Sequence, residues 1–242
     1  MSWVLANLPT IAGHLLAHLL QAVPAIIASF VLAIPIARLA RVARPLRAVL
    51  VTGSSLLYAV PSLALFVILP IILATGIRDP LNVIVALTLY GLALLVPATA
   101  DALDAVDARV LDAATAMGMG RLRCFLTVEL PLAGPAILTG LRVVTVSTIS
   151  LTTVGAVLGV RSLGWLFTDG FQRGITAEIV TGLVATAALA LVLDGLVLAL
   201  GRLCLPWTWK RAGATGQVLE ADGASAAGGR EDDGREKREG ES

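Results

Sequence analysis

Two ionisable residues, Arg142 and Asp194, stand within long runs of apolar residues. A charged group in a lipid bilayer is costly, and its presence is typical of a functional or pairing role. Both residues are expected in the cytoplasmic halves of two different membrane helices, at a similar depth, which favours an ion pair between those helices. The alternative is that each side chain extends along its own helix to the membrane interface. Neither residue is interpreted as a substrate ligand.

His14 and His18 are four residues apart and therefore lie on one face of a helix. Such a pair can bind a metal ion, but no carboxylate, cysteine or third histidine lies nearby in the sequence. Cys124 and Cys204 also lack the paired spacing of a zinc site or a disulfide framework. The sequence therefore predicts no metal site, and we interpret the two histidines as the polar end of a helix.

Motifs that would supply catalysis are absent from the sequence. It contains no Gly-x-x-x-x-Gly-Lys-Ser/Thr phosphate-binding loop, no His-Glu-x-x-His pair and no Gly-x-Ser-x-Gly nucleophile turn. We therefore expect neither an enzyme nor a chain that binds a nucleotide by itself, and we expect no cofactor in it.

The composition indicates which elements must position these side chains. The 242 residues are 57% apolar and 14% charged, with a mean hydropathy of +0.88, whereas soluble domains are about 45–50% apolar and about 25% charged. A stretch of roughly 17–25 apolar residues spans a bilayer as a helix. Five stretches qualify: 11–37, 49–74, 81–100, 135–158 and 177–200. We expect an all-α fold, a polytopic membrane bundle of about five helices, with kinks at the prolines of the first two.

The distribution of basic residues predicts the orientation, because Lys and Arg are enriched in cytoplasmic loops. With the N-terminus outside, the cytoplasmic loops and flank hold ten basic residues and the external loops hold three. We therefore expect an external N-terminus (1–10), a membrane domain (11–205) and a cytoplasmic tail (206–242). From about residue 212 the tail is polar and charged, which predicts disorder.

The loop between the third and fourth apolar stretches, 101–134, is long and patterned. One apolar stripe at helical spacing predicts an amphipathic helix, formed by Leu103, Val106, Val110, Ala114 and Met117. Gly118 and Gly120 then interrupt the pattern, and a second short helix is expected over about 121–130. Two short helices at the cytoplasmic surface suit either the lipid headgroup region or a groove on a partner protein.

The loop resembles the EAA loop of ABC importer permeases. The family pattern is Glu-Ala-Ala, three residues, Gly, nine residues, an aliphatic residue, any residue and Leu-Pro. The matching residues are Asp112, Ala113, Ala114, Gly118, Val128, Leu130 and Pro131. The one departure is aspartate at the first position. The resemblance implies that these residues couple the permease to an ATPase subunit, with Gly118 turning the chain in a left-handed conformation. The alternative is that the small residues only pack two helices together.

Four further segments resemble permeases for glycine betaine, choline and carnitine: 59–65, 86–90, 140–142 and 158–164. Methionine and other importers share much of this architecture. The resemblance implies a type I ABC importer permease of the cytoplasmic (inner) membrane that carries an osmoprotectant such as glycine betaine, choline, carnitine or proline. It also implies the partners: two ATP-binding cassette subunits that bind ATP-Mg, a second permease, identical or homologous, and an extracytoplasmic binding protein. No nucleic acid is expected.

Four residues are candidates for the translocation pathway. Pro61 and Ser62 can open their helix, since irregular backbone at membrane depth is tolerated where it lines a cavity; a simple packing kink is the alternative. Tyr58 and Tyr90 can offer ring faces to a quaternary ammonium group. An autonomous secondary transporter or channel is the alternative function, and it would need an intramembrane carboxylate, for which Asp194 is the candidate.

Overall fold

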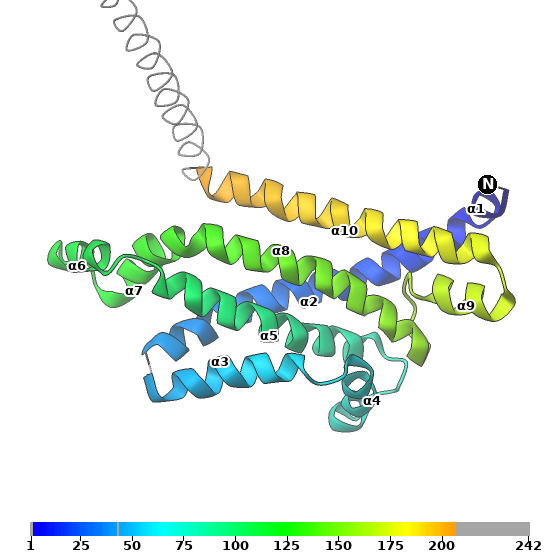
Figure 1. The fold of residues 1–242 in the computed structure, drawn as a ribbon, viewed down its shortest axis with the longest axis horizontal. Helices are drawn as coiled ribbons and strands as arrows, with labels where there is room; N and C mark the ends of the chain where they lie inside the picture. Colours follow the sequence, from blue (N-terminus) through cyan, green and yellow to red (C-terminus); the bar gives the residue numbers. More distant parts are fainter. Residues whose placement is uncertain (1, 43, 207–242) are drawn as a thin grey trace, which may run out of the picture. The chain divides into compact units, whose positions relative to one another are not determined.

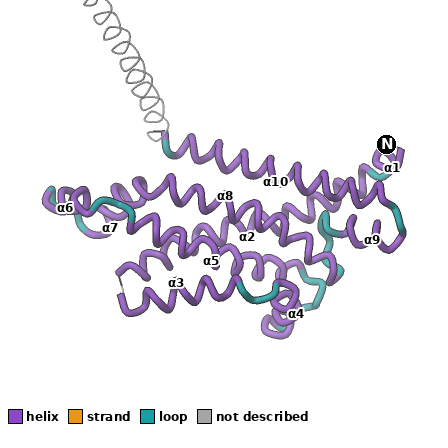
Figure 2. The backbone as a smooth tube through the Cα atoms, in the orientation of Figure 1, coloured by secondary structure: helices purple, strands orange, loops and turns teal. Residues whose placement is uncertain are grey.

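The structure, a computed structural model, describes residues 2–42 and 44–206 (Figure 1). These residues form helices and loops and contain no strand (Figure 2). The α-helices are α1 (Ser2–Ala6), α2 (Leu8–Val42), α3 (Arg44–Tyr58), α4 (Ser62–Leu73), α5 (Pro80–Asp104), α6 (Ala108–Ala116), α7 (Arg121–Cys124), α8 (Leu130–Val154), α9 (Trp165–Arg173) and α10 (Thr176–Cys204). A π-helix, η1 (Phe125–Glu129), precedes α8, and a 3₁₀-helix, η2 (Gly155–Leu158), follows it. The predicted tail, 206–242, lies outside the described residues except for Pro206.

The all-α membrane bundle expected from the sequence is confirmed. Four helical stretches are long and apolar enough to cross a membrane: Leu8–Val42, Pro80–Asp104, Arg121–Leu158 and Thr176–Cys204. The fourth span begins at Arg121, fourteen residues earlier than expected, because the second helix of the predicted loop runs into it without a break.

The second predicted span, 49–74, is not one straight helix. Its halves, Arg47–Tyr58 and Ser62–Leu73, are bent by 108° at the break between them. Pro61 explains the break, because proline has no N–H to donate and disfavours helical backbone at the residue before it. The described residues therefore contain four candidate spans, or five if the bent pair crosses the membrane as one.

The core is built by α2, α5 and α8, with α3 lying along α5 (Figure 1). Small residues let the helices approach closely, as is common in membrane bundles. One stripe of α2 is fully buried and consists of Ala22, Ala25, Ser29, Ala33, Ala37 and Ala40. Gly91 of α5 faces Ser29 so closely that a Cβ built there would lie 2.1 Å from the Ser29 Oγ. The Ser29 hydroxyl donates to the Ala25 carbonyl over 2.7 Å.

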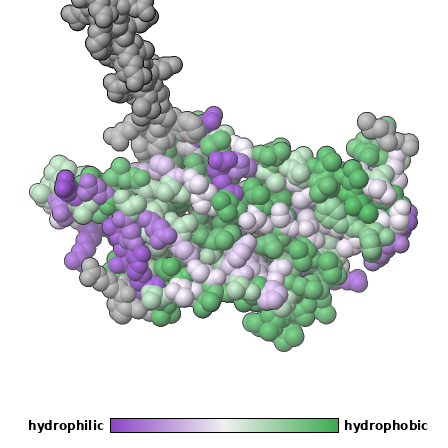
Figure 3. All heavy atoms as spheres, viewed as in Figure 1, coloured by the Kyte–Doolittle hydropathy of each residue, from purple (hydrophilic) through white to green (hydrophobic). Residues whose placement is uncertain are grey.

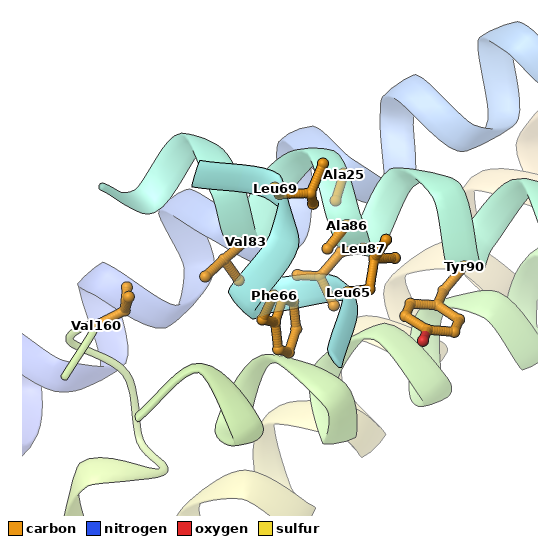
Figure 4. Close-up of a cluster of buried hydrophobic side chains, with 9 residues drawn as sticks. All are labelled: Ala25, Leu65, Phe66, Leu69, Val83, Ala86, Leu87, Tyr90 and Val160. Atoms are coloured by element: carbon orange, nitrogen blue, oxygen red, sulfur yellow. The ribbon is translucent and has the colours of Figure 1, made fainter. Parts of the chain in front are cut away.

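The short helix α4 completes the core beside the break. Phe66 and Leu69 of α4 pack against Val83 and Leu87 of α5, and Tyr90 lies at the edge of the same cluster (Figure 4). Large apolar side chains cover the outside instead, as Figure 3 shows over much of the visible face. On α10 only 6% of the apolar stretch is buried. A surface of this kind suits hydrocarbon or a partner helix.

Candidate functional site

The predicted loop helix begins later than its apolar stripe suggests. Helix α5 ends at Asp104 and α6 begins at Ala108, so the stripe from Leu103 to Met117 does not form one helix. Asp107 causes the new start, because its carboxylate accepts a hydrogen bond from the Arg109 N–H over 2.9 Å and caps α6. Leu103 is accordingly buried in the bundle, whereas Met117 is 73% exposed.

Gly118 ends α6 in the left-handed conformation expected for it, with φ of +84°. Its N–H donates to the Thr115 carbonyl over 2.9 Å, and the Met119 N–H donates to the Ala114 carbonyl over 3.2 Å. This pairing is typical of a helix that ends at glycine. Gly120 then begins α7 with an ordinary φ of −66°. The chain thus reverses at Gly118 and places α6 beside α7 (Figure 1).

The second helix of the loop is not a separate element. Helix α7, the π-helix η1 and α8 follow one another without a gap, and the Leu130 N–H donates to the Phe125 carbonyl in the wider π pattern. Pro131 stands in the first turn of α8. A proline there removes one helical donor and crowds the preceding turn, which fits the wider turn just before it.

The motif residues fall into two groups by exposure. Asp112, Ala113 and Gly118 are exposed at the tip of the loop, whereas Ala114 is 2% exposed and faces inward. The second part of the motif, Val128, Leu130 and Pro131, is half-buried, and Leu130 packs against a core cluster. Four large apolar side chains of the same loop are exposed as well: Val110, Met117, Leu122 and Leu126. We call these four, with Asp112 and Ala113, the loop surface. All six of these residues are exposed.

A set of ion pairs at the base of the loop was missed by the sequence analysis. The Arg47 guanidinium lies 2.5 Å from the Asp104 carboxylate, and Arg41 Nε lies 3.5 Å from it. Arg41 also pairs with Glu129. In the sequence these arginines indicate only the membrane orientation, because their acidic partners are more than 50 residues away in the chain. A dense group of hydrophilic residues is visible at this end of the bundle (Figure 3).

The four pathway candidates meet at the break between α3 and α4. The Tyr90 hydroxyl donates to the Val60 carbonyl over 2.5 Å and so holds the unwound segment. The Tyr58 and Tyr90 rings meet edge to face, with centroids 5.9 Å apart. Tyr58 is 47% exposed and Tyr90 only 3%. Pro61 lies in the break and Ser62 begins α4. An exposed aromatic ring therefore stands beside irregular backbone.

The structure pairs Arg142 of α8 with Asp194 of α10. Arg142 Nε donates to Asp194 Oδ1 over 2.8 Å, and Nη2 donates to Oδ2 over 2.7 Å. This two-pronged geometry is the strongest that an arginine and a carboxylate can adopt. The interaction joins α10, which has little buried surface, to the core helix α8.

We expect Arg142→Ala and Asp194→Ala each to lower the thermal stability of the purified protein, because each leaves an unpaired charge at membrane depth. The double variant should be no less stable than the worse single variant. The measurement is a melting curve of each purified protein in one detergent. Additive losses in the double variant would show that the two side chains act independently.

The two histidines of α2, His14 and His18, lie near the start of this helix, at the opposite end of α2 from the loop, and pack there. The His14 ring stacks on Trp165 of α9 at a centroid distance of 4.6 Å, and His18 is fully buried. Gln21, one turn further along, donates to the Arg161 carbonyl over 2.7 Å and holds the loop before α9. Among the described residues no group of three His, Cys, Asp or Glu side chains is placed to hold a metal ion.

Comparison with known proteins places the chain. The family model described as "Binding-protein-dependent transport system inner membrane component" matches residues 29–209. The choline transport system permease protein OpuBD of Bacillus subtilis is 30% identical over 81% of this chain and 86% of its own length. The glycine betaine/carnitine/choline permease protein OpuCD of the same species is 29% identical over 73% of this chain and 76% of its own.

A third relative is much longer. The ergothioneine transport permease/ergothioneine binding protein EgtU of Helicobacter pylori is 33% identical over 62% of this chain, which spans only 27% of that protein.

Two solved structures share the fold. An inward-facing MetNI methionine ABC transporter matches with a TM-score of 0.67 at 20% identity, over 81% of this chain and 94% of that one. An amino acid ABC transporter with histidines matches with a TM-score of 0.65 at 17% identity, over 84% and 96%. The family match covers most of the chain and all of the loop at 101–134, so the chain belongs to the inner-membrane components of binding-protein-dependent transport systems, the permease subunits of ABC importers.

Proposed function

We propose that this permease carries a small osmoprotectant with a quaternary ammonium group, such as glycine betaine, choline or carnitine. The observation that carries the importer part of the proposal is the loop surface, in which Asp112 and Ala113 are exposed together with large apolar side chains of α6, α7 and η1. The named substrates of the relatives support the substrate class: choline for one, and glycine betaine, carnitine and choline for another. Ergothioneine, named for a third, is also a trimethylammonium compound.

The loop surface is the proposed contact with the ATPase. Exposed apolar side chains beside one carboxylate suit a cleft on a folded partner, because burying them removes apolar surface from water. Two ATP-binding cassette subunits would bind ATP-Mg, and two permease chains, identical or homologous, would each present one loop. An external binding protein would deliver the solute. ATP then biases the spans between inward-open and outward-open states.

The proposed orientation follows from the same surface. An ATPase lies in the cytoplasm, so α6 and α7 face inward and the end that carries α9 faces outward. The arginines of the α2–α3 corner then lie on the cytoplasmic side, in keeping with the enrichment of basic residues there. The N-terminus is external in this arrangement.

Tyr58, Tyr90, Pro61 and Ser62 are the proposed lining of the pathway. The half-exposed Tyr58 ring is available to a cation. The buried Tyr90 ring meets it edge to face and so holds the Tyr58 ring in place. The carbonyls at the C-terminal end of α3 add a partial negative charge beside the ring. Together they suit a transient site for a quaternary ammonium group, weak enough to release it.

The test is uptake by the reconstituted complex. The chain is purified with its ATPase and permease partners, placed in proteoliposomes loaded with ATP-Mg, and given radiolabelled glycine betaine or choline with the external binding protein. We expect uptake that requires ATP. Tyr58→Leu should raise the KM about two- to fivefold, since a cation–π contact contributes about 0.5–1 kcal/mol at exposed sites. Tyr58→Phe, which keeps the ring, is the matched control.

Three results would each contradict one part of the proposal. Uptake by this chain alone, driven by an ion gradient without ATP, would show an autonomous secondary transporter. The complex could instead take up, with ATP, a solute that has no quaternary ammonium group, and take up no glycine betaine, choline or carnitine. This result would support an ATP-driven importer but reject the proposed substrate class. An equal KM for Tyr58→Leu and Tyr58→Phe would remove Tyr58 from the pathway.

A further inference from the structure

We propose that Arg41, Arg47, Asp104 and Glu129, the ionic cluster, are positioning residues that make the coupling loop and the spans move together. The inference rests on the proposed function, because it concerns how the loop passes the movement of an ATPase to the membrane helices. Each member stands at or near the end of a different element: α2, α3, α5 and η1.

The two carboxylates stand at the two bases of the loop. Asp104 is the last residue of α5, three positions before the Asp107 that caps α6. Glu129 is the last residue of η1, where the returning chain enters α8. Arg41 pairs with both carboxylates. The Arg41 guanidinium therefore links both ends of the loop, the end of α5 at Asp104 and the end of η1 at Glu129, to the end of α2.

A second contact, between an arginine and an aromatic ring, also joins η1 to α2. The Arg38 guanidinium lies 4.1 Å from the centre of the Phe125 ring, a cation–π geometry. Phe125 is 5% exposed and belongs to a core cluster with Ala37 of α2 and Leu103 of α5. Arg38 and Arg41 lie three residues apart on α2, and Phe125 and Glu129 are the first and last residues of η1. Two contacts thus run in parallel between α2 and η1.

The spacing of the two η1 residues explains how both reach α2. Residues four apart lie on the same face of a helical segment, as they do in an α-helix. Phe125 and Glu129 are such a pair, and the Leu130 N–H to Phe125 carbonyl bond closes the turn. π turns within α-helices are frequent at functional sites. Here the turn aims one charged and one aromatic side chain at the same helix.

Within the ionic cluster the Arg41–Glu129 pair is the more buried one. The Glu129 side chain is 14% exposed and that of Arg41 is 27% exposed, whereas those of Arg47 and Asp104 are 40% and 34% exposed. Partly buried charges are screened less by salt than exposed ones. Helix α7 already continues through η1 into α8, and the paired charges add a direct connection from the base of the loop to α2, α3 and α5.

The first experiment separates coupling from assembly. Arg41→Ala, Glu129→Ala and the double variant are compared with Arg173→Ala, which removes the exposed Arg173–Asp169 ion pair in α9. The readouts are the amount of ATPase that co-purifies and the number of solute molecules taken up per ATP hydrolysed. We expect the ratio to fall at least fivefold in both single variants, with no further fall in the double variant. Arg173→Ala should keep the wild-type ratio. An unchanged ratio in Glu129→Ala overturns the proposal.

A second experiment covers variants that fail to assemble. Arg41→Cys and Glu129→Cys are combined in a chain whose own Cys124 and Cys204 are replaced by serine, and the two new thiols are joined by a short bifunctional reagent. Because the substitutions remove the Arg41–Glu129 ion pair, the protein should take up little solute per ATP before cross-linking. If the base of the loop and α2 move as one, cross-linking should raise that ratio at least twofold. A ratio that stays low, or a loss of transport on cross-linking, would overturn the proposal. Absence of ATP-driven uptake by the wild type would instead reject the proposed function.

Discussion

Replacing Gly118 by valine is expected to reduce ATP-driven uptake at least tenfold. Gly118 has φ of +84°, where a side chain costs about 1–2 kcal/mol and a β-branched one more. No atom lies within 4 Å of a Cβ built there, so the effect is conformational and not a clash inside the chain. The end of α6 would unwind and the loop surface would point elsewhere.

Gly120→Val is the matched control for this prediction. Gly120 lies two residues further on, has equally open space around its Cβ, and has φ of −66°, which valine adopts without strain. Uptake and ATPase co-purification are measured for both variants. We expect Gly120→Val to stay within twofold of the wild type. Equal losses in the two variants would point to crowding at the partner and away from backbone strain.

Gly91→Ala is expected to destabilise the bundle by about 1–3 kcal/mol, the usual cost of overpacking a core. The added Cβ would lie 2.1 Å from the Ser29 Oγ and 2.7 Å from the Ser29 Cβ. Ser29 is fully buried and donates to the backbone of α2. The helices α2 and α5 would have to separate where the core is tightest.

The same contact supplies the rescue. Ser29→Gly removes the two atoms that the new methyl group would meet most closely and leaves Val144 Cγ1 at 3.3 Å, so the double variant should recover most of the lost stability. Gly13→Ala, on the exposed side of α2 with nothing within 4 Å, should change little. The measurement is the melting temperature in one detergent, with a drop of about 5 °C expected for Gly91→Ala. Failure of Ser29→Gly to restore it would mean that another contact limits the packing.

The contrast between two ion pairs shows what the sequence can predict. Arg142 and Asp194 are 52 residues apart, yet the pairing hypothesis names them, because charges in apolar spans are rare and few partners compete. Arg41 and Glu129 are 88 residues apart, at span ends where many charges gather. In the sequence these two residues look like any other charged residues at the ends of membrane helices. Only the packing of α2 against η1 selects this pair.

The loop shows the same division at shorter range. The left-handed turn at Gly118 is a property of one residue and its neighbours, so a motif can predict it. The apolar stripe from Leu103 to Met117 is equally local, but the prediction of one helix is wrong because Asp107 caps a new one. Likewise Pro61 predicts an opening, whereas the angle of 108° depends on how α4 packs against α5.

The length of α2 has a geometric consequence for the proposed cycle. Its 35 residues form one continuous helix of roughly 50 Å, because each residue adds about 1.5 Å. That is well beyond the hydrocarbon thickness of about 30 Å. His14 near one end stacks on Trp165 of α9, and Arg41 near the other end belongs to the ionic cluster. If a helix of this length tilts by about 10°, its two ends move sideways relative to each other by roughly 9 Å. A small rotation in mid-membrane therefore becomes a large movement at both faces at once.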